Sequence, residues 1–276
     1  MPELPEVEIA ARNLRAWTRG RRIERVEVDP KARYVFRPSS PAAFARTLAG
    51  TRFGEIRRIG KHLLVTLERE GKPLGLLAHL GMTGKWLRRT EGDPPTRFSR
   101  ARIHLDDGAV LHFDDHRLFG RLRVIPGARF EAVREVAALG DDPLERGIDR
   151  ARLGEALARS RLPVKVRIMD QGILPGVGNI QASEALFRAR LDPRREARAL
   201  SGREVNALAE AVLASIRDAI AEQEGPEISY VEEPGSDNPF AVYGREGERC
   251  PRCRKAEILR IVQAQRSTFF CPRCQR

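Results

Sequence analysis

The chain has 276 residues, of which 50 are lysine or arginine and 38 are aspartate or glutamate, so its formal net charge is +12. Its length suits about two domains, and 41% hydrophobic with 32% charged residues exclude a disordered chain. It has no apolar run of membrane-spanning length and no signal-peptide pattern, so we expect a cytoplasmic protein. The positive charge favours a polyanionic partner, most often nucleic acid.

Apolar residues recur at helical spacing over residues 5–18, and Gly20 ends this predicted helix. From about residue 22 to 126, short β runs follow one another, which is typical of an antiparallel sandwich or barrel. Asp107-Gly108 predicts a hairpin turn between two of these runs. The clearest runs are His62–Glu68, Pro73–Leu80, Arg100–Leu105, Ala109–Phe113 and Arg121–Ile125.

The pattern becomes helical from about residue 130. Pro163 fits the first turn of a helix that runs toward Asp170. Ser201 and Glu204 form a capping box that opens a long amphipathic helix. Residues 225–244 are rich in proline, glycine, serine and aspartate, so they are predicted to form a linker or mobile loop.

All four cysteines lie near the end of the chain, in two Cys-x2-Cys knuckles that are 17 residues apart. Two such knuckles can hold one zinc ion between four thiolates, whereas a redox dithiol needs only one pair. Four protein ligands leave no open position, so we predict one structural Zn²⁺. The predicted ligands are Cys250, Cys253, Cys271 and Cys274.

Residues 250–276 also contain seven basic residues and one acid. Because the guanidinium fork of arginine matches phosphate oxygens, we expect this segment to bind a nucleic-acid backbone. Arg266 precedes the apolar pair Phe269-Phe270 and is predicted to lie at the tip of a two-stranded turn. The alternative is a solvated surface with no ligand.

The N-terminus offers a possible nucleophile. Met1 precedes the small residue Pro2, so we expect Met1 to be removed, which leaves a secondary α-amine. An α-amine has a pKa of about 7.7–8.0, so much of it is neutral and nucleophilic near pH 7. Glu3 and Glu6 follow, and their alternative role is to favour a helix N-terminus through the macrodipole.

A glycine-rich turn, LPGVGNI at residues 174–180, leads into a predicted helix. Such a turn exposes backbone N–H groups that suit phosphate, although a turn between packed helices needs no ligand. Together, this turn, the opening PELPEVE and the zinc ribbon resemble the formamidopyrimidine-DNA glycosylases over nearly the whole chain. These are bifunctional base-excision repair enzymes. The start also differs from that of the related endonuclease VIII group, which usually has glycine where this chain has Leu4.

The resemblance implies an α+β multidomain fold with an N-terminal β-sandwich, a helix–two-turn–helix domain and a zinc finger. The corresponding boundaries are 1–128 for the catalytic domain, 129–225 for the helical domain, 226–244 for a loop at the position of a lesion lid, and 245–276 for the zinc finger. It also implies double-stranded damaged DNA as the partner, no membrane, monomeric action, and zinc as the only cofactor.

The resemblance further implies the catalytic groups. Pro2 is the nucleophile that attacks the sugar C1′, Glu3 is its acid/base partner, and Glu6 helps to order the N-terminus. Lys61, in Gly-Lys-His-Leu, is the catalytic-site lysine near the target phosphate, and Arg266 belongs to the same site. The attack yields a Schiff base, and β- and δ-elimination then cut the strand.

Two loops resemble those that replace the extruded base. Met82, in His-Leu-Gly-Met, fills the vacated space, Arg117 faces the orphaned base and Phe119 wedges the stack. From their residue types alone, Met82 and Phe119 would be assigned to the core. Asn179 matches a phosphate-binding position, as does Arg266, and Lys165 matches a basic position before the glycine-rich turn.

The chain departs from the family in three places. Phe98 stands where a phosphate-binding histidine is usual, and neighbouring Arg97 or Arg100 is expected to substitute. Gln181 replaces a usual tyrosine. Residues 218–244, hereafter the acidic segment, contain seven acids and no lysine or arginine, where the family has a loop that closes over an oxidised purine.

We therefore hypothesise conserved chemistry with altered or weakened recognition of 8-oxoguanine. Two alternatives remain: an oxidised-pyrimidine glycosylase of the endonuclease VIII type, or a protein that binds damaged DNA without chemistry. The joint presence of Pro2, Glu3 and Lys61 argues against the second.

Overall fold

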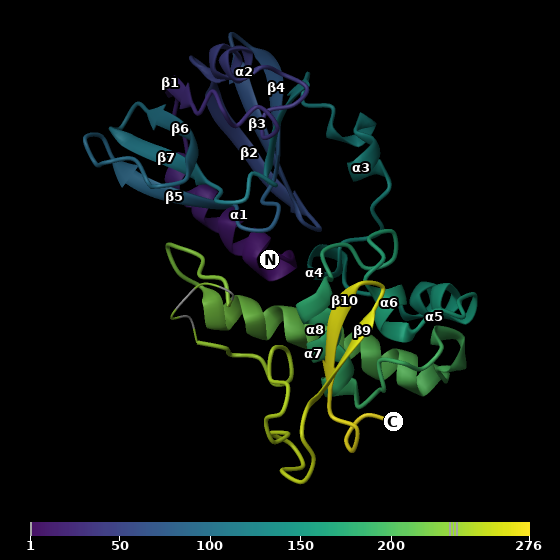
Figure 1. The fold of residues 1–276 in the computed structure, drawn as a ribbon. Coiled ribbons are helices and arrows are strands. Elements are labelled where there is room, and N and C mark those ends of the chain that lie inside the picture. Colours follow the sequence, from purple (N-terminus) through teal and green to yellow (C-terminus); the bar gives the residue numbers. More distant parts are fainter. Residues whose placement is uncertain (1, 232, 234, 236) are drawn as a thin grey trace. The chain divides into compact units, whose positions relative to one another are not determined.

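A computed structural model describes residues 2–231, 233, 235 and 237–276 (Figure 1). The predicted removal of Met1, and the acid Glu232 of the acidic segment, lie outside these residues. The chain divides into two compact units. The described residues of the first are 2, 6–137, 223–231 and 233, and those of the second are 3–5, 138–222, 235 and 237–276.

The first unit is a sandwich of two four-stranded antiparallel sheets. One sheet has the order β1-β6-β7-β5 and the other β2-β3-β4-β8. The bounds are β1 Ile23–Val28, β2 Arg52–Ile59, β3 His62–Arg69, β4 Lys72–His79, β5 Lys85–Thr90, β6 Ser99–Leu105, β7 Ala109–Asp114 and β8 Arg121–Pro126. All five β runs predicted from the sequence are therefore strands.

Two helices flank these strands along the chain. The predicted N-terminal helix is α1, Leu4–Thr18, and the chain beyond it turns at Gly20 with φ +72°. The second helix, α2, spans Pro41–Leu48 inside a region for which only β runs were predicted. Its local signals were present but short, since the Ser40 hydroxyl caps Ala43 N–H at 3.2 Å and proline occupies the first turn.

The predicted hairpin turn joins β6 to β7. Gly108 N–H donates to the Leu105 carbonyl at 3.1 Å, and Gly108 has φ +79°, a conformation that glycine adopts without strain. After β8, a short 3-10 helix at Phe130–Ala132 and α3, Arg134–Ala137, pack Phe130, Val133 and Val136 against the β3-β4-β8 sheet face.

The second unit is mainly helical. Its helices are α4 Pro143–Arg146, α5 Arg150–Ala158, α6 Val164–Ile168, α7 Asn179–Ala189, a 3-10 helix at Ala197–Ala199, and α8 Gly202–Gln223. Pro163 precedes α6, which ends at Ile168, two residues before the predicted end. The capping box forms as predicted, because Glu204 accepts from Ser201 N–H at 2.8 Å and Ser201 accepts from Glu204 N–H at 3.4 Å.

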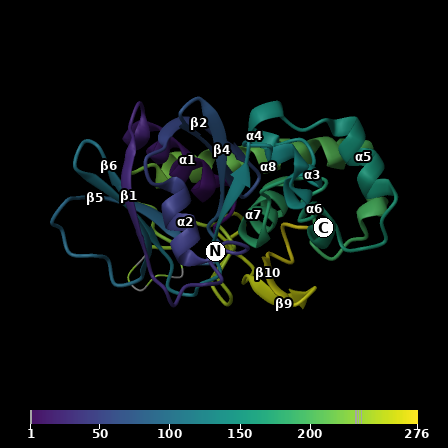
Figure 2. The same ribbon diagram turned by 90° about the horizontal axis from the view of Figure 1, so that it is seen from above.

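The hairpin of β9, Leu259–Gln263, and β10, Arg266–Phe270, completes the second unit. Figures 1 and 2 both show this yellow hairpin beside α7. Phe269 of β10 packs in one apolar cluster with Phe187 of α7 and with two of the cysteines. The packing of the hairpin on α7 therefore depends on the cysteine cluster.

Candidate active site and nucleic-acid interface

The carboxylate of Glu3 is held at the N-terminus of α7. Glu3 is fully buried, and its two oxygens accept hydrogen bonds from the N–H groups of Gly178 at 3.1 Å, Ile180 at 2.9 Å and Gln181 at 2.9 Å. The first turn of a helix leaves such N–H groups without internal partners and carries a partial positive charge. The N–H groups expected to suit phosphate thus bind Glu3.

The glycine-rich turn is shaped to receive the N-terminal segment. Leu4 N–H donates to the Gly176 carbonyl at 3.0 Å. Gly176 has φ +87°, and a Cβ there would lie 2.6 Å from the Leu4 Cβ. Only glycine fits so close to another main chain in this conformation. The turn therefore fixes Glu3, and Pro2, one residue earlier and also buried, carries the candidate nucleophile.

Three further groups gather in the same unit as Glu3. Lys165 is fully buried and its Nζ donates to the Asn179 Oδ1 and, at 3.4 Å, to the Ser267 carbonyl. Asn179 Nδ2 also donates to that carbonyl at 2.9 Å. The side chains of Lys165 on α6 and Asn179 on α7 therefore form one polar cluster with the main-chain carbonyl of Ser267 on β10.

Arg266, the other predicted phosphate ligand on this unit, lies slightly away from its expected position. The tip of the hairpin is Ala264-Gln265, with φ +46° and +61°, rather than Arg266. Arg266 is the exposed first residue of β10 and pairs with Gln263. The predicted tip lies one residue too far toward the C-terminus. The apolar residues Phe269 and Phe270 indicate that a strand is present, but they do not indicate at which residue its pairing with β9 begins.

Burial lowers the pKa of the Lys165 ammonium to about 8, while the Glu3 carboxylate acts in the opposite direction and Arg266 in the same direction. The Lys165 charge is therefore lost as pH rises through about 8. If this charge attracts DNA phosphate, affinity for an uncleavable abasic-site analogue should fall about tenfold between pH 7 and pH 9. Fluorescence anisotropy measures this loss. The Lys165→Met variant should bind more weakly at pH 7 and lack the step; an unchanged step would assign it to another group.

Lys61 follows Gly60, which has φ +55°, and lies at one end of the β3–β4 hairpin. His62 opposes His79 at this end, with ring centroids 5.0 Å apart. Burial lowers the pKa of His79 to about 4, so it is neutral at pH 7. Because His79 Nδ1 accepts from Gly81 N–H at 3.0 Å, its Nε2 carries the proton and is a donor.

The two histidines line a cavity of about 500 Å³ in the first unit, together with Arg37, Arg121 and Arg123. His79 belongs to the His-Leu-Gly-Met motif, but the sequence does not predict it as a site residue. The register of β3 against β4 was the missing information, because only pairing brings His79 opposite His62 and next to Lys61.

The two loops predicted to fill the vacated base position pack together. A Cβ on Gly81 would lie 2.5 Å from Gly120 N, so the loops touch through main chain. The buried Asp115 carboxylate accepts from the Thr83 hydroxyl at 2.7 Å, from Arg117 N–H at 3.2 Å and from Gly120 N–H at 2.7 Å. The Asp115 side chain therefore holds the turn between β7 and β8 in place.

Arg117 and Phe119 project from this turn. Phe119 is 48% exposed, unlike a core residue, and the Arg117 guanidinium lies 5.0 Å from its ring centroid. Met82, on the adjoining loop, is partly exposed. An exposed aromatic ring is a suitable wedge between base pairs.

The structure separates the two arginines expected to substitute for a histidine at position 98. Arg100 is engaged internally, with its guanidinium 2.8 Å from the Asp29 carboxylate and 2.8 Å from the Asp115 carbonyl. Arg97 is exposed and lies over the Phe98 ring at 5.2 Å. Of these two, only Arg97 is placed to meet an external phosphate.

The four cysteine sulfurs lie within 4.8 Å of one another. Cys250 and Cys274 are 3.8 Å apart, as are Cys253 and Cys271. A tetrahedral zinc ion with Zn–S bonds of about 2.3 Å requires sulfurs about 3.8 Å apart. The residues therefore fit one structural Zn²⁺, as predicted.

The acidic segment is bound within the first unit over its described residues 224–233. Glu233 contacts Lys85 at 3.0 Å and Glu227 contacts Arg89 at 2.5 Å, both on β5. The buried Tyr230 donates its hydroxyl to the carbonyl just before β5 at 2.6 Å. The segment has no helix or strand beyond the end of α8 among its described residues, but it is packed and paired rather than a free linker.

The substitution at Gln181 also has a structural role. Ser215 on α8 donates its hydroxyl to Gln181 Oε1 at 2.7 Å in a buried position. The side chain that replaces the family's usual tyrosine therefore ties α7 to α8 beneath the Glu3 carboxylate.

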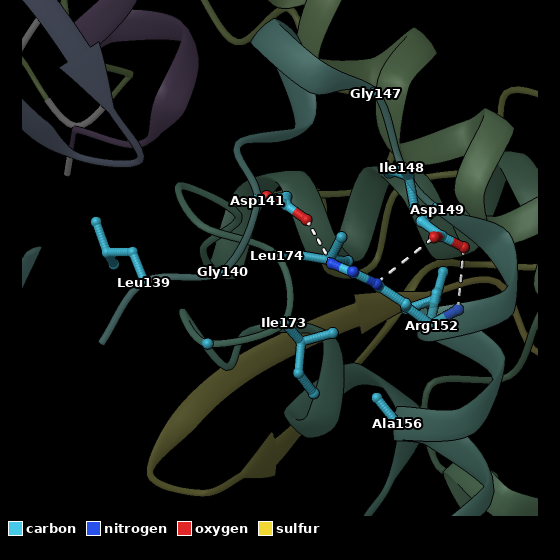
Figure 3. A pocket seen from close by; sticks show the side chains of 12 residues that line it. Leu139, Gly140, Asp141, Gly147, Ile148, Asp149, Arg152, Ala156, Ile173 and Leu174 are labelled. Atoms are coloured by element: carbon cyan, nitrogen blue, oxygen red, sulfur yellow. Dashed lines mark hydrogen bonds and ion pairs between the residues drawn. The ribbon is translucent and has the colours of Figure 1, made fainter. Parts of the chain in front are cut away.

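A separate pocket of about 350 Å³ lies in the second unit (Figure 3). Arg152 crosses it between Asp141, at 2.9 Å, and Asp149. None of the predicted site residues lines it. Its charged groups are paired with one another, so it is not part of the candidate active site.

No helix in the described part of the chain is both long and apolar enough to cross a bilayer. Three family models match the chain: the formamidopyrimidine-DNA glycosylase N-terminal domain at residues 1–122, the formamidopyrimidine-DNA glycosylase H2TH domain at 139–229, and the zinc finger found in FPG and IleRS at 247–276. The chain is 38% identical to the formamidopyrimidine-DNA glycosylases of Acidiphilium cryptum and of Rhodospirillum centenum, with 100% of each chain covered.

Solved structures agree. The MutM (Fpg) protein of Thermus thermophilus is 38% identical, with a TM-score of 0.81 over 99% of this chain and 98% of that one. Lactococcus lactis Fpg in complex with abasic-site DNA is 27% identical, with a TM-score of 0.86 and 99% of both chains covered. The same enzyme with Fapy-dG DNA is 28% identical, with a TM-score of 0.86 over 99% of this chain and 100% of that one.

Proposed function

This chain belongs to the formamidopyrimidine-DNA glycosylase family, and from that premise we propose that it removes oxidised purines from double-stranded DNA and then cleaves the abasic strand. The oxidised purines are formamidopyrimidines and 8-oxoguanine. The observation that carries the proposal is the Glu3 carboxylate, held by three N–H groups one residue after Pro2.

In the proposed mechanism, the damaged nucleotide leaves the stack, since its sugar cannot be reached inside a duplex. Met82, Arg117 and Phe119 occupy the gap. The neutral Pro2 amine attacks C1′, so the N–C1′ bond forms as the glycosidic bond breaks and the base leaves. The amine then loses its proton while Glu3 protonates the ring oxygen, so the C1′–O4′ bond opens and an iminium forms between C1′ and the Pro2 nitrogen. The resulting iminium acidifies the 2′ proton, and β- and δ-elimination then release both ends of the sugar.

The remaining predicted residues bind the backbone. We propose that Lys61 and Arg266 contact phosphates around the extruded nucleotide, and that Arg97 on the first unit contacts a further phosphate. Lys165 and Asn179 are buried and donate to the Ser267 carbonyl, so we propose that they exchange this carbonyl for a phosphate when DNA binds. Zinc supplies the structural link that keeps β10 in place. We further propose that the enzyme acts as a monomer in the cytoplasm, and that the four segments named from the sequence are its functional divisions.

Borohydride reduction tests the chemistry. With an abasic duplex, the processed protein should form a covalent complex, and a Pro2→Gly variant should form about 100-fold less in the same time. Strand nicking without a trapped complex would contradict the Pro2 mechanism. A protein that only binds damage would give neither nicking nor a trapped complex.

The same assay tests the lesion preference when it is run on four duplexes, which contain 8-oxoguanine, formamidopyrimidine, an oxidised pyrimidine or an abasic site. The acidic segment stands where the family has a loop that closes over an oxidised purine, and here Glu227 and Glu233 of this segment are paired with Arg89 and Lys85. We therefore propose that excision of 8-oxoguanine is weak relative to cleavage of the abasic site. Ordinary preference for 8-oxoguanine opposite cytosine would refute this. Faster excision of an oxidised pyrimidine than of formamidopyrimidine would favour the endonuclease VIII type.

A further inference from the structure

An aromatic and cationic cluster lies where the segment before β6 meets the turn after β7. The ring of His116 lies 4.5 Å from the ring of Phe98, centroid to centroid, at an interplanar angle of 46°. The Arg97 guanidinium lies 5.2 Å from the same Phe98 ring. Arg117, the residue proposed to face the orphaned base, directly follows His116. The cluster is therefore contiguous with a predicted part of the DNA-binding surface.

The main chain fixes this arrangement. Asp115 N–H donates to the Phe98 carbonyl at 3.0 Å, and Phe98 N–H donates to the Asp114 carboxylate at 3.3 Å. The buried Asp115 carboxylate then holds the turn that contains His116. The position of the imidazole against Phe98 is thus set by hydrogen bonds on both sides of it, and little entropy is lost if it binds a ligand.

The cluster has the charge of an anion-binding surface. His116, Arg97 and Arg117 are exposed, and none is paired with a carboxylate among the residues that the structure describes. Their neighbour Arg100, in contrast, is paired with Asp29 at 2.8 Å. An imidazole N–H donates to a phosphate oxygen in either charge state, so His116 can act without a change in protonation.

The proposed function brings a DNA backbone to this surface, and position 98 holds a phenylalanine, which cannot donate a hydrogen bond. We infer that His116 contacts a backbone phosphate of the bound DNA, with Phe98 as the ring on which its imidazole rests. The hydrogen-bond donor absent at position 98 is thereby supplied from position 116. This inference rests on the proposed function, because it requires that the turn bearing Arg117 and Phe119 enters the duplex.

Binding of an uncleavable abasic-site duplex to the whole zinc-loaded protein tests the inference. The His116→Ala variant should bind at least about fivefold more weakly, since a hydrogen bond to a charged group is lost. Adding Phe98→His to that variant should restore most of the affinity, because the second substitution returns an imidazole to the same surface. Lys72→Ala, at the opposite end of the β3–β4 hairpin from Lys61, is the matched control and should bind like the wild type.

Two results would overturn the inference: a loss smaller than about fivefold in His116→Ala, or a larger loss that Phe98→His fails to recover. The second result would mean that the alanine variant only disturbs packing, and thermal unfolding of each variant checks this directly. Failure of the proposed function is distinct, because the wild-type protein would then neither prefer abasic-site DNA nor form a borohydride-trapped complex.

Discussion

Replacing Glu3 by glutamine is expected to lower the rate of base excision by at least about 100-fold, which is typical of the loss of a positioned general acid. The amide cannot deliver a proton to the sugar ring oxygen. One of its two terminal atoms also becomes an NH₂ group that faces the N–H groups of α7. Glu3 now accepts three hydrogen bonds there, from Gly178, Ile180 and Gln181.

Single-turnover excision of formamidopyrimidine at saturating protein measures this effect. Binding of the abasic-site analogue and the unfolding temperature show whether the glutamine variant still folds and binds. Glu24→Gln, on exposed β1, removes the same charge elsewhere and should excise like the wild type. Excision within about tenfold of wild type in a folded Glu3→Gln variant would remove Glu3 from the role of general acid.

Loss of zinc is expected to abolish tight DNA binding, with an affinity at least about 100-fold lower, because structural zinc contributes folding free energy directly. Cys250 and Cys271 are buried in the cluster that joins β10 to Phe187 of α7. Without the metal, these thiolates lose the ion that they bind in common, and the hairpin is no longer held against α7. The Ser267 carbonyl, to which Asn179 and Lys165 donate, would then be displaced.

Chelation tests whether the loss of affinity is reversed by zinc, and the Cys271→Ser variant tests whether it follows from the loss of one zinc ligand. Chelated protein should regain affinity when Zn²⁺ is returned, whereas Cys271→Ser should remain zinc-poor by metal analysis and lose affinity permanently. Glu246→Gln, an exposed change in the same region, should retain one zinc per chain. A metal-free protein that binds the abasic-site analogue as tightly as the zinc-loaded one would show that the zinc finger is dispensable.

The features that could be predicted from the sequence are those carried by neighbours along the chain. The zinc ligands are an example, since two knuckles of two cysteines bring all four sulfurs together once a short hairpin forms. The capping box at Ser201 and the five β runs depend in the same way on spacings of a few residues. The helix α2 was missed because its signals, one cap and one proline, lie among residues with β character.

The site itself depends on contacts between distant segments. Glu3 and Ile180 are separated by 177 residues, and nothing in either segment indicates that the carboxylate occupies the helix N-terminus expected to suit phosphate. The same holds for the two arginines near position 98, where Asp29 removes Arg100 from the surface. Acids of the acidic segment likewise meet their partners on β5 over 138 and 148 residues.

The sequence by itself determined the family and the zinc site, and it predicted the catalytic groups, because motifs and ligand spacings can be recognised without knowledge of how segments pack. Tertiary structure decided which charges are available. The net charge of +12 does not distinguish Arg100, paired internally, from exposed Arg97, and it does not count His116 at all. Local periodicity records only which face of an element is apolar, whereas the partner of a polar side chain is chosen by the pairing of strands and loops far apart in the chain.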